Sequence, residues 1–177
     1  MPDLRPTPDE FPSSYAGYQY ADYVSQVPDG GILTQLAPQL EASLALLRPL
    51  SEDQAGYRYA AGKWSVKQLV GHLSDTERAL ADRALHFARG NTQPVPGFDQ
   101  DEYVAAAGSD QRPLPALLAE WEAVRRSTGA LFRNLPREAW NRSGSADGVR
   151  FTVRAIAYII AGHELHHRRV LIERYLD

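Results

Sequence analysis

Apolar residues recur at helical spacing in four long segments of the chain. The clearest segment begins at Ile32 and continues through Leu36 and Leu40, which follow one another at four-residue intervals, as in an amphipathic helix. The same spacing predicts long helices over residues 31–48, 65–89, about 113–134, and from 151 almost to the C-terminus. No segment alternates convincingly between apolar and polar residues. The pattern therefore predicts an all-α fold, a four-helix bundle.

Capping residues and loop-forming residues predict where these helices begin and end. Ser65 followed by Gln68 matches a capping box at the start of the second long helix, and Gly90 marks its end. Pro38 either kinks the first helix or marks its true start. The connection after the second helix contains two loops and a short helical stretch near 100–107. Its length predicts a crossover between the second and third long helices rather than a tight hairpin.

Residues 1–28 differ from the rest of the chain because they are rich in Pro, Tyr, Ser and Asp. We expect an arm with little regular structure apart from a short helical turn around 18–24. Its tyrosines are too numerous for a free tail, so the arm should pack on the body of the protein or on a partner subunit. Residues 29–177 then form the bundle, in which 143–148 makes a flexible turn or a short hairpin.

Three of the five histidines fall between residues 163 and 167, in the last predicted helix. His163 and His167 are separated by about 40° around the helix axis. Both lie within the apolar stripe, whereas His166 lies at its edge. Two imidazoles one turn apart are a common beginning of a metal site. Buried histidines satisfied by hydrogen bonds explain the same pattern, so this segment alone leaves both interpretations open.

A third metal ligand has to come from another helix, and the second helix offers His72. This histidine borders the apolar face, and Thr76, Ala79 and Arg83 lie close to the same line along the helix. Small and polar residues beside a core stripe are typical of a cavity wall. The competing interpretation is that His72 is a half-exposed surface residue and that Arg83 pairs with an acid. His86 lies at a different angle and is expected to be structural or exposed.

The composition argues against several classes of protein. The 177 residues include no cysteine, so a metal site must use His, Asp, Glu or water, and disulfides are excluded. With a formal net charge of −3 and no cluster of Lys and Arg, nothing indicates binding to nucleic acid or to an anionic membrane. No apolar run approaches the length of a membrane span, and the N-terminus lacks the apolar core of a signal peptide. We therefore expect a cytoplasmic protein.

Three stretches stand out as motifs. They are GKWSVKQLVGHLSDTER at residues 62–78, PGFD at 96–99 and IAGHELHHR at 160–168. They resemble the second-helix motif, the loop that follows it and the last-helix motif of the DinB-like (YfiT-like) superfamily. The resemblance covers roughly residues 30–175. One departure follows the last motif, where members of the family often have Arg-Gly-Gln and this chain has Arg168-Arg169-Val170. The departure keeps the histidines but removes the glutamine as a substrate contact.

The resemblance implies a four-helix bundle, usually a homodimer, in which three histidines hold a divalent metal. By position, the ligands are His72, His163 and His167, and His166 is a neighbour rather than a ligand. Imidazole ligands suit zinc, nickel and iron alike. Relatives include thiol S-transferases that use low-molecular-weight thiols such as bacillithiol, a mycothiol-dependent isomerase, and many proteins regarded as metal-dependent hydrolases.

The resemblance thus implies a divalent-metal-dependent enzyme that acts on a small molecule, either a thiol S-transferase, which we prefer, or a hydrolase. Because the chain has no cysteine, a transferase needs an external thiol as co-substrate. Arg83 is the candidate for binding a carboxylate of that cofactor or of the substrate. Asp75, Glu77 and Asp99 are candidates for orienting the metal ligands, although most of these acids are expected to be solvated or to cap a helix. The catalytic general base is not identifiable from the sequence. The alternative is a non-catalytic bundle that binds a metal or another ligand.

The last motif also satisfies H-E-x-x-H, the pattern of zinc proteases, with His163 and His167 as ligands and Glu164 as general base. Those enzymes usually take a third ligand well downstream, but only ten residues follow His167. Glu173, the one acid before the terminal Asp177, lies about 80° away from the ligand line. The pattern therefore disfavours a protease. Glu164 is expected to face a neighbouring helix or to orient an imidazole.

Overall fold

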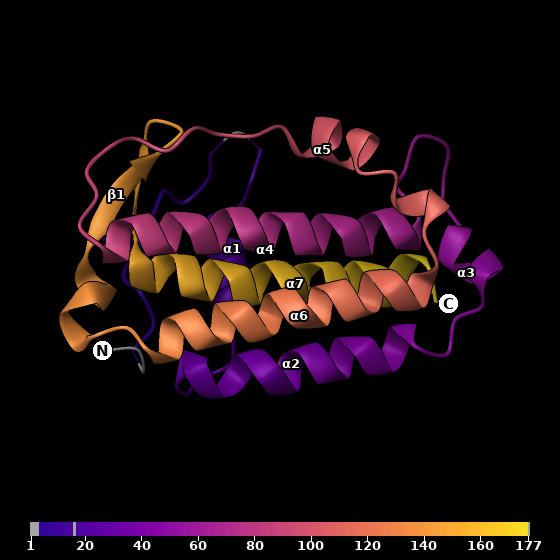
Figure 1. The fold of residues 1–177 in the computed structure, drawn as a ribbon, viewed down its shortest axis with the longest axis horizontal. Helices are drawn as coiled ribbons and strands as arrows, with labels where there is room; N and C mark the ends of the chain where they lie inside the picture. Colours follow the sequence, from indigo (N-terminus) through magenta and orange to yellow (C-terminus); the bar gives the residue numbers. More distant parts are fainter. Residues whose placement is uncertain (1–3, 16, 177) are drawn as a thin grey trace.

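The computed structural model describes residues 4–176 except Ala16, and its four long helices lie side by side (Figure 1). These helices are α2 (Ile32–Leu47), α4 (Val66–Ala88), α6 (Leu114–Arg133) and α7 (Val153–Arg174). The predicted all-α four-helix bundle is confirmed. Within the described residues, no helix combines the length and the apolar character needed to cross a membrane.

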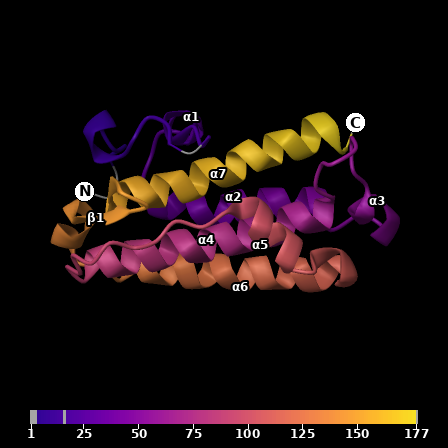
Figure 2. The same ribbon diagram turned by 90° about the horizontal axis from the view of Figure 1, so that it is seen from above.

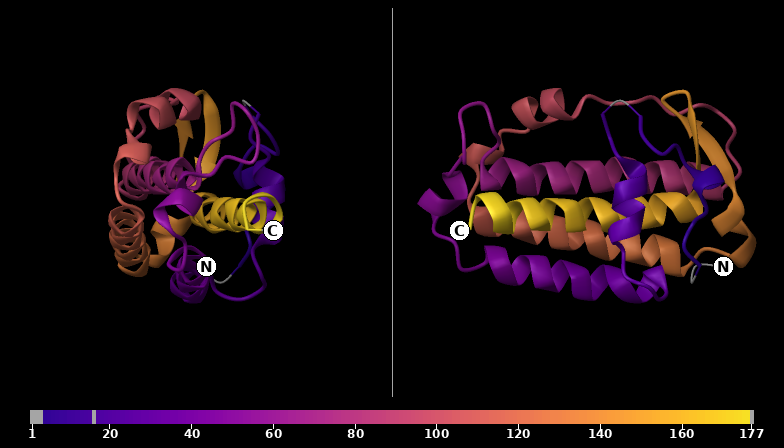
Figure 3. Two further views of the ribbon diagram at one scale, coloured as in Figure 1. Left: turned by 90° about the vertical axis from the view of Figure 1, so that its right-hand side faces the viewer. Right: turned by 180° about the vertical axis from the view of Figure 1, so that it is seen from behind.

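Each long helix packs against two others. α4 contacts α6 and α7, and α2 contacts the same two helices, so α2 and α4 lie across one diagonal of the bundle (Figure 3). Ser65 Oγ donates to Asp110 Oδ1 at 2.5 Å, which ties the start of α4 to the segment before α6. Tyr175 Oη donates to the Trp64 carbonyl oxygen at 2.7 Å, which ties the end of α7 to the start of α4. α4 therefore runs parallel to α6 and antiparallel to α7.

Because α4 and α6 are parallel neighbours, the chain between them returns along the whole length of the bundle (Figure 1). This connection carries a short helix, α5 (Gln100–Ala106), and a 3-10 turn, η2 (Ser109–Gln111). Asp99 caps α5, because its carboxylate accepts from the backbone N–H groups of Asp101 and Glu102. The predicted crossover between the second and third long helices is confirmed.

Local sequence signals explain where the long helices start. Ser65 Oγ accepts from the Gln68 N–H, and the Gln68 side chain accepts from the Ser65 N–H, which is the capping box predicted for α4. Thr152 caps α7 by accepting from the Ala155 N–H at 3.0 Å. Pro38 lies inside α2, so it does not mark the start of that helix.

Short elements complete the fold. β1 (Ser143–Ala146) and β2 (Val149–Thr152) form an antiparallel hairpin, which selects the short hairpin over the flexible turn. Asp147 and Gly148 in its turn have φ values of 53° and 77°, as a type I′ turn requires. Further short helices are η1 (Pro8–Glu10), η3 (Arg137–Asn141) and α3 (Glu52–Gly56). α3 lies between the first and second long helices predicted from the sequence.

The N-terminal segment lies against α7 through α1 (Tyr20–Gln26), which crosses the outer side of that helix (Figures 2 and 3). A Cβ atom added to Gly162 would lie 2.0 Å from the Tyr23 carbonyl oxygen. Glycine at this position therefore lets the two backbones touch. The division of the chain into an arm of residues 1–28 and a bundle of residues 29–177 stays a prediction.

The buried apolar residues form two clusters, one toward each end of the bundle. The first includes Phe87, Trp140 and Ile156 near the hairpin, and the second includes Leu44 and Trp121 at the other end. Where the clusters meet, all four long helices contribute buried polar side chains: Gln39, Ser43, His72, Thr76, Glu77, Arg125, Thr128, His163 and Glu164. We call this set the polar layer. Buried polar groups are costly unless they are partnered, so their contacts are the place to look for function.

Candidate metal centre

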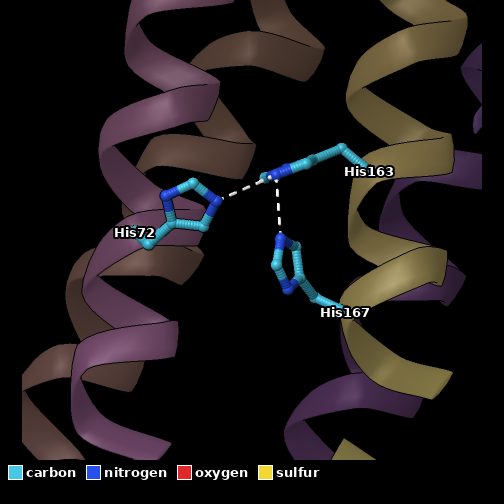
Figure 4. Close-up of side chains that lie close together, drawn as sticks. All are labelled: His72, His163 and His167. Carbon is cyan, nitrogen blue, oxygen red and sulfur yellow. Dashed lines mark hydrogen bonds between the residues drawn. The ribbon is translucent and has the colours of Figure 1, made fainter. Parts of the chain in front are cut away.

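Three histidine side chains meet inside the polar layer (Figure 4). His72 comes from α4, and His163 and His167 come from α7, one turn apart. The Nε2 atom of His163 lies 3.0 Å from that of His72 and 3.0 Å from that of His167. In the described part of the chain, these residues form the one group whose ligand atoms converge closely enough for a metal ion, all within 4.8 Å of one another.

The remaining two histidines lie outside this group. His166 packs against Tyr23, with ring centroids 5.4 Å apart, and its ring lies beside that of His167. His86 lies near the end of α4, where its Nδ1 atom is 3.0 Å from the side-chain nitrogen of Asn91. Neither residue takes part in the convergence of nitrogen atoms.

Packing on several sides orients the three rings. The Trp64 ring centroid lies 4.7 Å from that of His72, and Tyr23 lies edge-on to His163 at 5.6 Å. Thr76, one turn after His72, has its hydroxyl oxygen 3.3 Å from His72 Nδ1. When His72 carries its proton on Nδ1 and donates it to this hydroxyl, its Nε2 atom keeps a free lone pair. That lone pair faces the other two histidines.

Burial keeps these imidazoles neutral near neutral pH. It lowers the pKa of His72 to about 4. Burial, together with the neighbouring imidazoles, lowers the pKa of His163 and the pKa of His167 well below the usual value. A neutral imidazole has a free lone pair on one of its nitrogens. The cluster therefore offers three uncharged nitrogen donors.

Hydrogen bonds among the three histidines cannot satisfy all of their ring nitrogens. His163 Nε2 has two imidazole nitrogens at 3.0 Å, but a neutral ring nitrogen offers either one N–H or one lone pair. His167 Nδ1 is buried and has no hydrogen-bond partner among the described residues. Three Nε2 lone pairs aimed at one point are instead the donor set that zinc and similar divalent ions accept in proteins. The residues fit a divalent metal better than they fit a self-contained histidine cluster.

A cavity of about 60 Å³ lies beside His163, between α4 and the N-terminal segment. Aromatic side chains line much of it: Tyr15, Tyr18, Tyr20, Tyr23, Phe98 and Phe151. α4 contributes Thr76 and Leu80. We call this space the aromatic cavity. Its lining suits an apolar or planar group held next to the histidines.

Arg83 is the cationic residue of the aromatic cavity, and only 7% of it is exposed. Its guanidinium carbon lies 5.6 Å from the centre of the Phe98 ring, and Nη2 donates to the Pro96 carbonyl oxygen at 3.1 Å. Asp147 also lines the cavity, but within the described residues Arg83 forms no ion pair with a carboxylate. The structural ion pair considered for Arg83 is therefore not found there, and its charge is available to an anionic ligand.

The polar layer also contains an ion network that sequence reasoning missed. Arg125 of α6 donates two hydrogen bonds of 2.8 Å to the Glu77 carboxylate and one of 2.6 Å to Glu164 Oε2. Gln39 and Ser43 of α2 each donate to the Glu164 carboxylate at 2.7 Å. Burial alone would lower the pKa of Arg125, but the two carboxylates raise it above its usual value. The network joins all four long helices.

The sequence does contain a signal for this network. Arg125 lies one turn after Trp121 and seven residues before Phe132, in the apolar stripe of α6, where a charge is out of place. The same contacts fix Glu164, which faces α2 and α6 rather than the histidines. Its predicted orientation toward a neighbouring helix is confirmed, and a zinc-protease arrangement with Glu164 as base is excluded.

The acids considered for orienting the metal ligands have other partners. Asp75 pairs with Arg78 at 3.3 Å near the surface, Glu77 is held by Arg125, and Asp99 caps α5. Among the described residues, none of the three acids forms a hydrogen bond with a histidine of the cluster. None of the three therefore orients a histidine by a hydrogen bond, and Asp99 has the capping role that was the competing expectation. Helical spacing alone does not show which partner a side chain reaches.

Known proteins resemble this chain in sequence. The model of the DinB superfamily matches residues 35–171, a range that includes all three clustered histidines. A proposed metal-dependent hydrolase of Oceanobacillus iheyensis is 24% identical over 120 residues, which are 67% of this chain and 68% of that protein.

Solved structures resemble the chain in fold. YfiT of Bacillus subtilis, described as a probable metal-dependent hydrolase with an unusual four-helix bundle topology, has a TM-score of 0.65 at 18% identity and covers 94% of this chain and 95% of its own. A mycothiol-dependent maleylpyruvate isomerase has a TM-score of 0.66 at 16% identity, over 78% of this chain and 58% of its own. The DinB-like protein YjoA of Bacillus subtilis has a TM-score of 0.58 at 21% identity, over 80% and 87%. These likenesses establish the fold.

Proposed function

Because this chain belongs to the DinB superfamily, we propose that His72, His163 and His167 hold a divalent metal ion in an enzyme that acts on a small molecule. Three neutral Nε2 atoms converge within 4.8 Å of one another next to a cavity, and this convergence carries the proposal. Zinc, nickel and iron all accept imidazole ligands. A divalent ion held by these three residues would make a bound water or thiol acidic near neutral pH.

Arg83 supplies the charge that selects the substrate. Its guanidinium binds a carboxylate or a similar anionic group of the substrate or cofactor, while the aromatic walls pack against the rest of the molecule. Arg83 and His163 both line the aromatic cavity. A molecule anchored at Arg83 therefore turns its reactive end toward the histidines.

Tyr20 and Tyr23 of α1 line the same cavity, and both side chains are buried. Burial raises the pKa of each phenol to about 12. Neither phenol therefore provides a base near neutral pH. Their role is to exclude water and to pack against the bound molecule.

The preferred reaction joins a low-molecular-weight thiol to an electrophile. The thiol loses its proton, its sulfur forms a bond to an electrophilic carbon, and the leaving group departs with the electrons of the broken bond and takes up a proton. The chain has no cysteine, so the sulfur comes from a separate molecule. The isomerase that shares the fold depends on mycothiol, itself a thiol, which supports this choice.

Metal analysis of the purified protein tests the centre. We expect roughly one divalent ion per chain, with loss of the ion in His72→Ala and in His167→Ala. His166→Ala is the matched control, because His166 adjoins a ligand but packs against Tyr23, and it should retain the ion. Unchanged metal content in both ligand variants would reject the centre.

Activity separates the candidate reactions. A transferase joins a small thiol to monochlorobimane, and a chelator abolishes the reaction. The Oceanobacillus protein and YfiT are both named as metal-dependent hydrolases, which supports hydrolysis as the alternative reaction. A hydrolase should cleave esters or amides without a thiol. Metal binding without either activity would indicate a non-catalytic binding protein. The homodimer stays a prediction, which sedimentation of the pure protein tests.

A further inference from the structure

A second hollow reaches the histidine centre, and it shares no lining residue with the aromatic cavity. Its volume is about 390 Å³. Its walls come from the segment before α4, from α5 and from the second half of α7. They include Tyr59, Lys63, Trp64, Asp101, His166 and His167. We call this hollow the Trp64 groove.

The two hollows meet the same centre through different histidines. His163 lines the aromatic cavity and His167 lines the Trp64 groove, and their Nε2 atoms lie 3.0 Å apart. A molecule in either hollow therefore brings a reactive atom to nearly the same point. A hydrolase needs one such hollow, because its second reactant is water. A reaction that joins two organic molecules needs two.

The Trp64 groove carries charges of both signs. Lys63 and Asp101 line it, and both also line an adjoining hollow of about 410 Å³ beside Gln68. Both side chains are exposed, and in the described part of the chain neither forms an ion pair. A cation and an anion that border one small space match a molecule that carries a carboxylate and an amine. The aromatic cavity also borders a cation and an anion, Arg83 and Asp147, but most of its lining is aromatic or aliphatic, so it suits a more apolar molecule.

We propose that the Trp64 groove binds the co-substrate, a small thiol that carries both an amine and a carboxylate. The inference rests on the proposed function and adds to it the place and the class of the thiol. Lys63 binds the carboxylate, Asp101 binds the ammonium group, and the thiol points toward His167. The electrophile places a small planar or apolar group in the aromatic cavity, whose volume is about 60 Å³, with its anionic group on Arg83.

Tryptophan fluorescence measures binding in this groove independently of activity. Trp121 and Trp140 are 1% and 2% exposed, whereas Trp64 is half-buried and lines the groove. A ligand there should change the emission of Trp64 alone. The full chain, with and without metal, is titrated with L-cysteine, with cysteamine and with 3-mercaptopropionate. L-Cysteine carries both charged groups, cysteamine carries only the amine, and 3-mercaptopropionate carries only the carboxylate. Trp64→Phe should abolish the signal, and calorimetry measures binding in parallel.

Charge-neutral variants test which end of the thiol each residue binds. Lys63→Gln should weaken cysteine and 3-mercaptopropionate about three- to fivefold, a factor typical of exposed ion pairs, and leave cysteamine unchanged. Asp101→Asn should weaken cysteine and cysteamine by a similar factor and leave 3-mercaptopropionate unchanged. Arg83→Gln is the matched control, because it removes a cation from the other hollow and should leave all three affinities unchanged.

Several outcomes would overturn the proposal while the metal centre stands. One is cysteine binding measured by calorimetry without any change in Trp64 emission, and another is no cysteine binding by either method. Affinities that do not respond to Lys63→Gln and Asp101→Asn would overturn it too. A weakening of thiol binding by Arg83→Gln would place the thiol in the aromatic cavity. The metal centre is tested separately: it would be rejected if His72→Ala left the metal content of the protein unchanged.

Discussion

Glu164 directly follows His163 in the chain, yet its carboxylate lies 2.6 Å from Arg125 Nη1 of α6 and, among the described residues, forms its hydrogen bonds with α2 and α6 and none with the histidine cluster. Consecutive residues of a helix point about 100° apart, so one turn of α7 contributes both to the histidine cluster and to the ion network. The hydrogen bonds of Glu164 hold α7 against rotation about its axis. The ion network and the histidine cluster therefore lie on different faces of α7.

Arg125→Met should destabilise the protein by about 3–5 kcal/mol, because it leaves two buried carboxylates without their cation. Urea unfolding followed by circular dichroism measures the loss. Arg126→Met is the matched control, because the Arg126 side chain is 68% exposed and pairs with Glu122 on the surface. Its cost should be about 0.5 kcal/mol or less. Equal costs for the two substitutions would show that the network contributes nothing beyond a surface ion pair.

Glu164→Gln should lower stability by about 1–3 kcal/mol, because an amide cannot satisfy the donors that surround the carboxylate. Metal content should stay unchanged, since Glu164 does not face the histidines. Thermal unfolding and metal analysis of the same sample measure both effects. The opposite result, full stability with loss of activity, is what a catalytic base at this position would give.

The helices and half of the histidine cluster could be predicted because they depend on local geometry. His163 and His167 are four residues apart on one helix and must share a face. That His72 joins them depends on the antiparallel packing of α4 on α7 and on its register, which periodicity does not encode. The resemblance to a family supplied that link.

The ion network and the close approach of α1 were beyond prediction for the same reason. Arg125 is visible as a charge in an apolar stripe, but its partners Glu77 and Glu164 come from helices whose positions around the bundle had to be known. From the sequence, Gly162 indicates only a residue that lowers the stability of its helix. Only the structure shows that Tyr23 touches it.

The metal-free protein should lose stability as the pH falls from about 6.5 toward 4. The pKa of His72 is about 4 in the folded chain, against about 6.5 in an unfolded chain. Between these values the unfolded state binds a proton that the folded state does not, so acid favours unfolding. The lowered pKa values of His163 and His167 act in the same direction.

Urea midpoints at about pH 7.5 and pH 5, measured with a chelator present, test this pH dependence. His72→Gln should reduce the difference between the two midpoints, because the variant cannot take up that proton. Zinc added at the higher pH should raise stability by mass action. Stability that grows on acidification would show that the histidines are not buried in their neutral form.

Gly162→Ala should loosen α1 from α7, because the added methyl group would lie 2.0 Å from the Tyr23 carbonyl oxygen. The expected cost is about 1–3 kcal/mol, with faster proteolysis of the segment that precedes α2. Metal content should persist, because the three histidines come from α4 and α7. Affinity for a ligand of the aromatic cavity should fall, because Tyr23 lines that cavity.

Gly129→Ala is the matched control, because Gly129 is also a helical glycine. Its added methyl group would meet only the end of the Arg133 side chain, at 3.0 Å, and that side chain can move. The substitution should therefore be neutral or stabilise the protein by up to about 1 kcal/mol. Equal rates of proteolysis in the two variants would show that the contact between Gly162 and Tyr23 does not hold α1 in place.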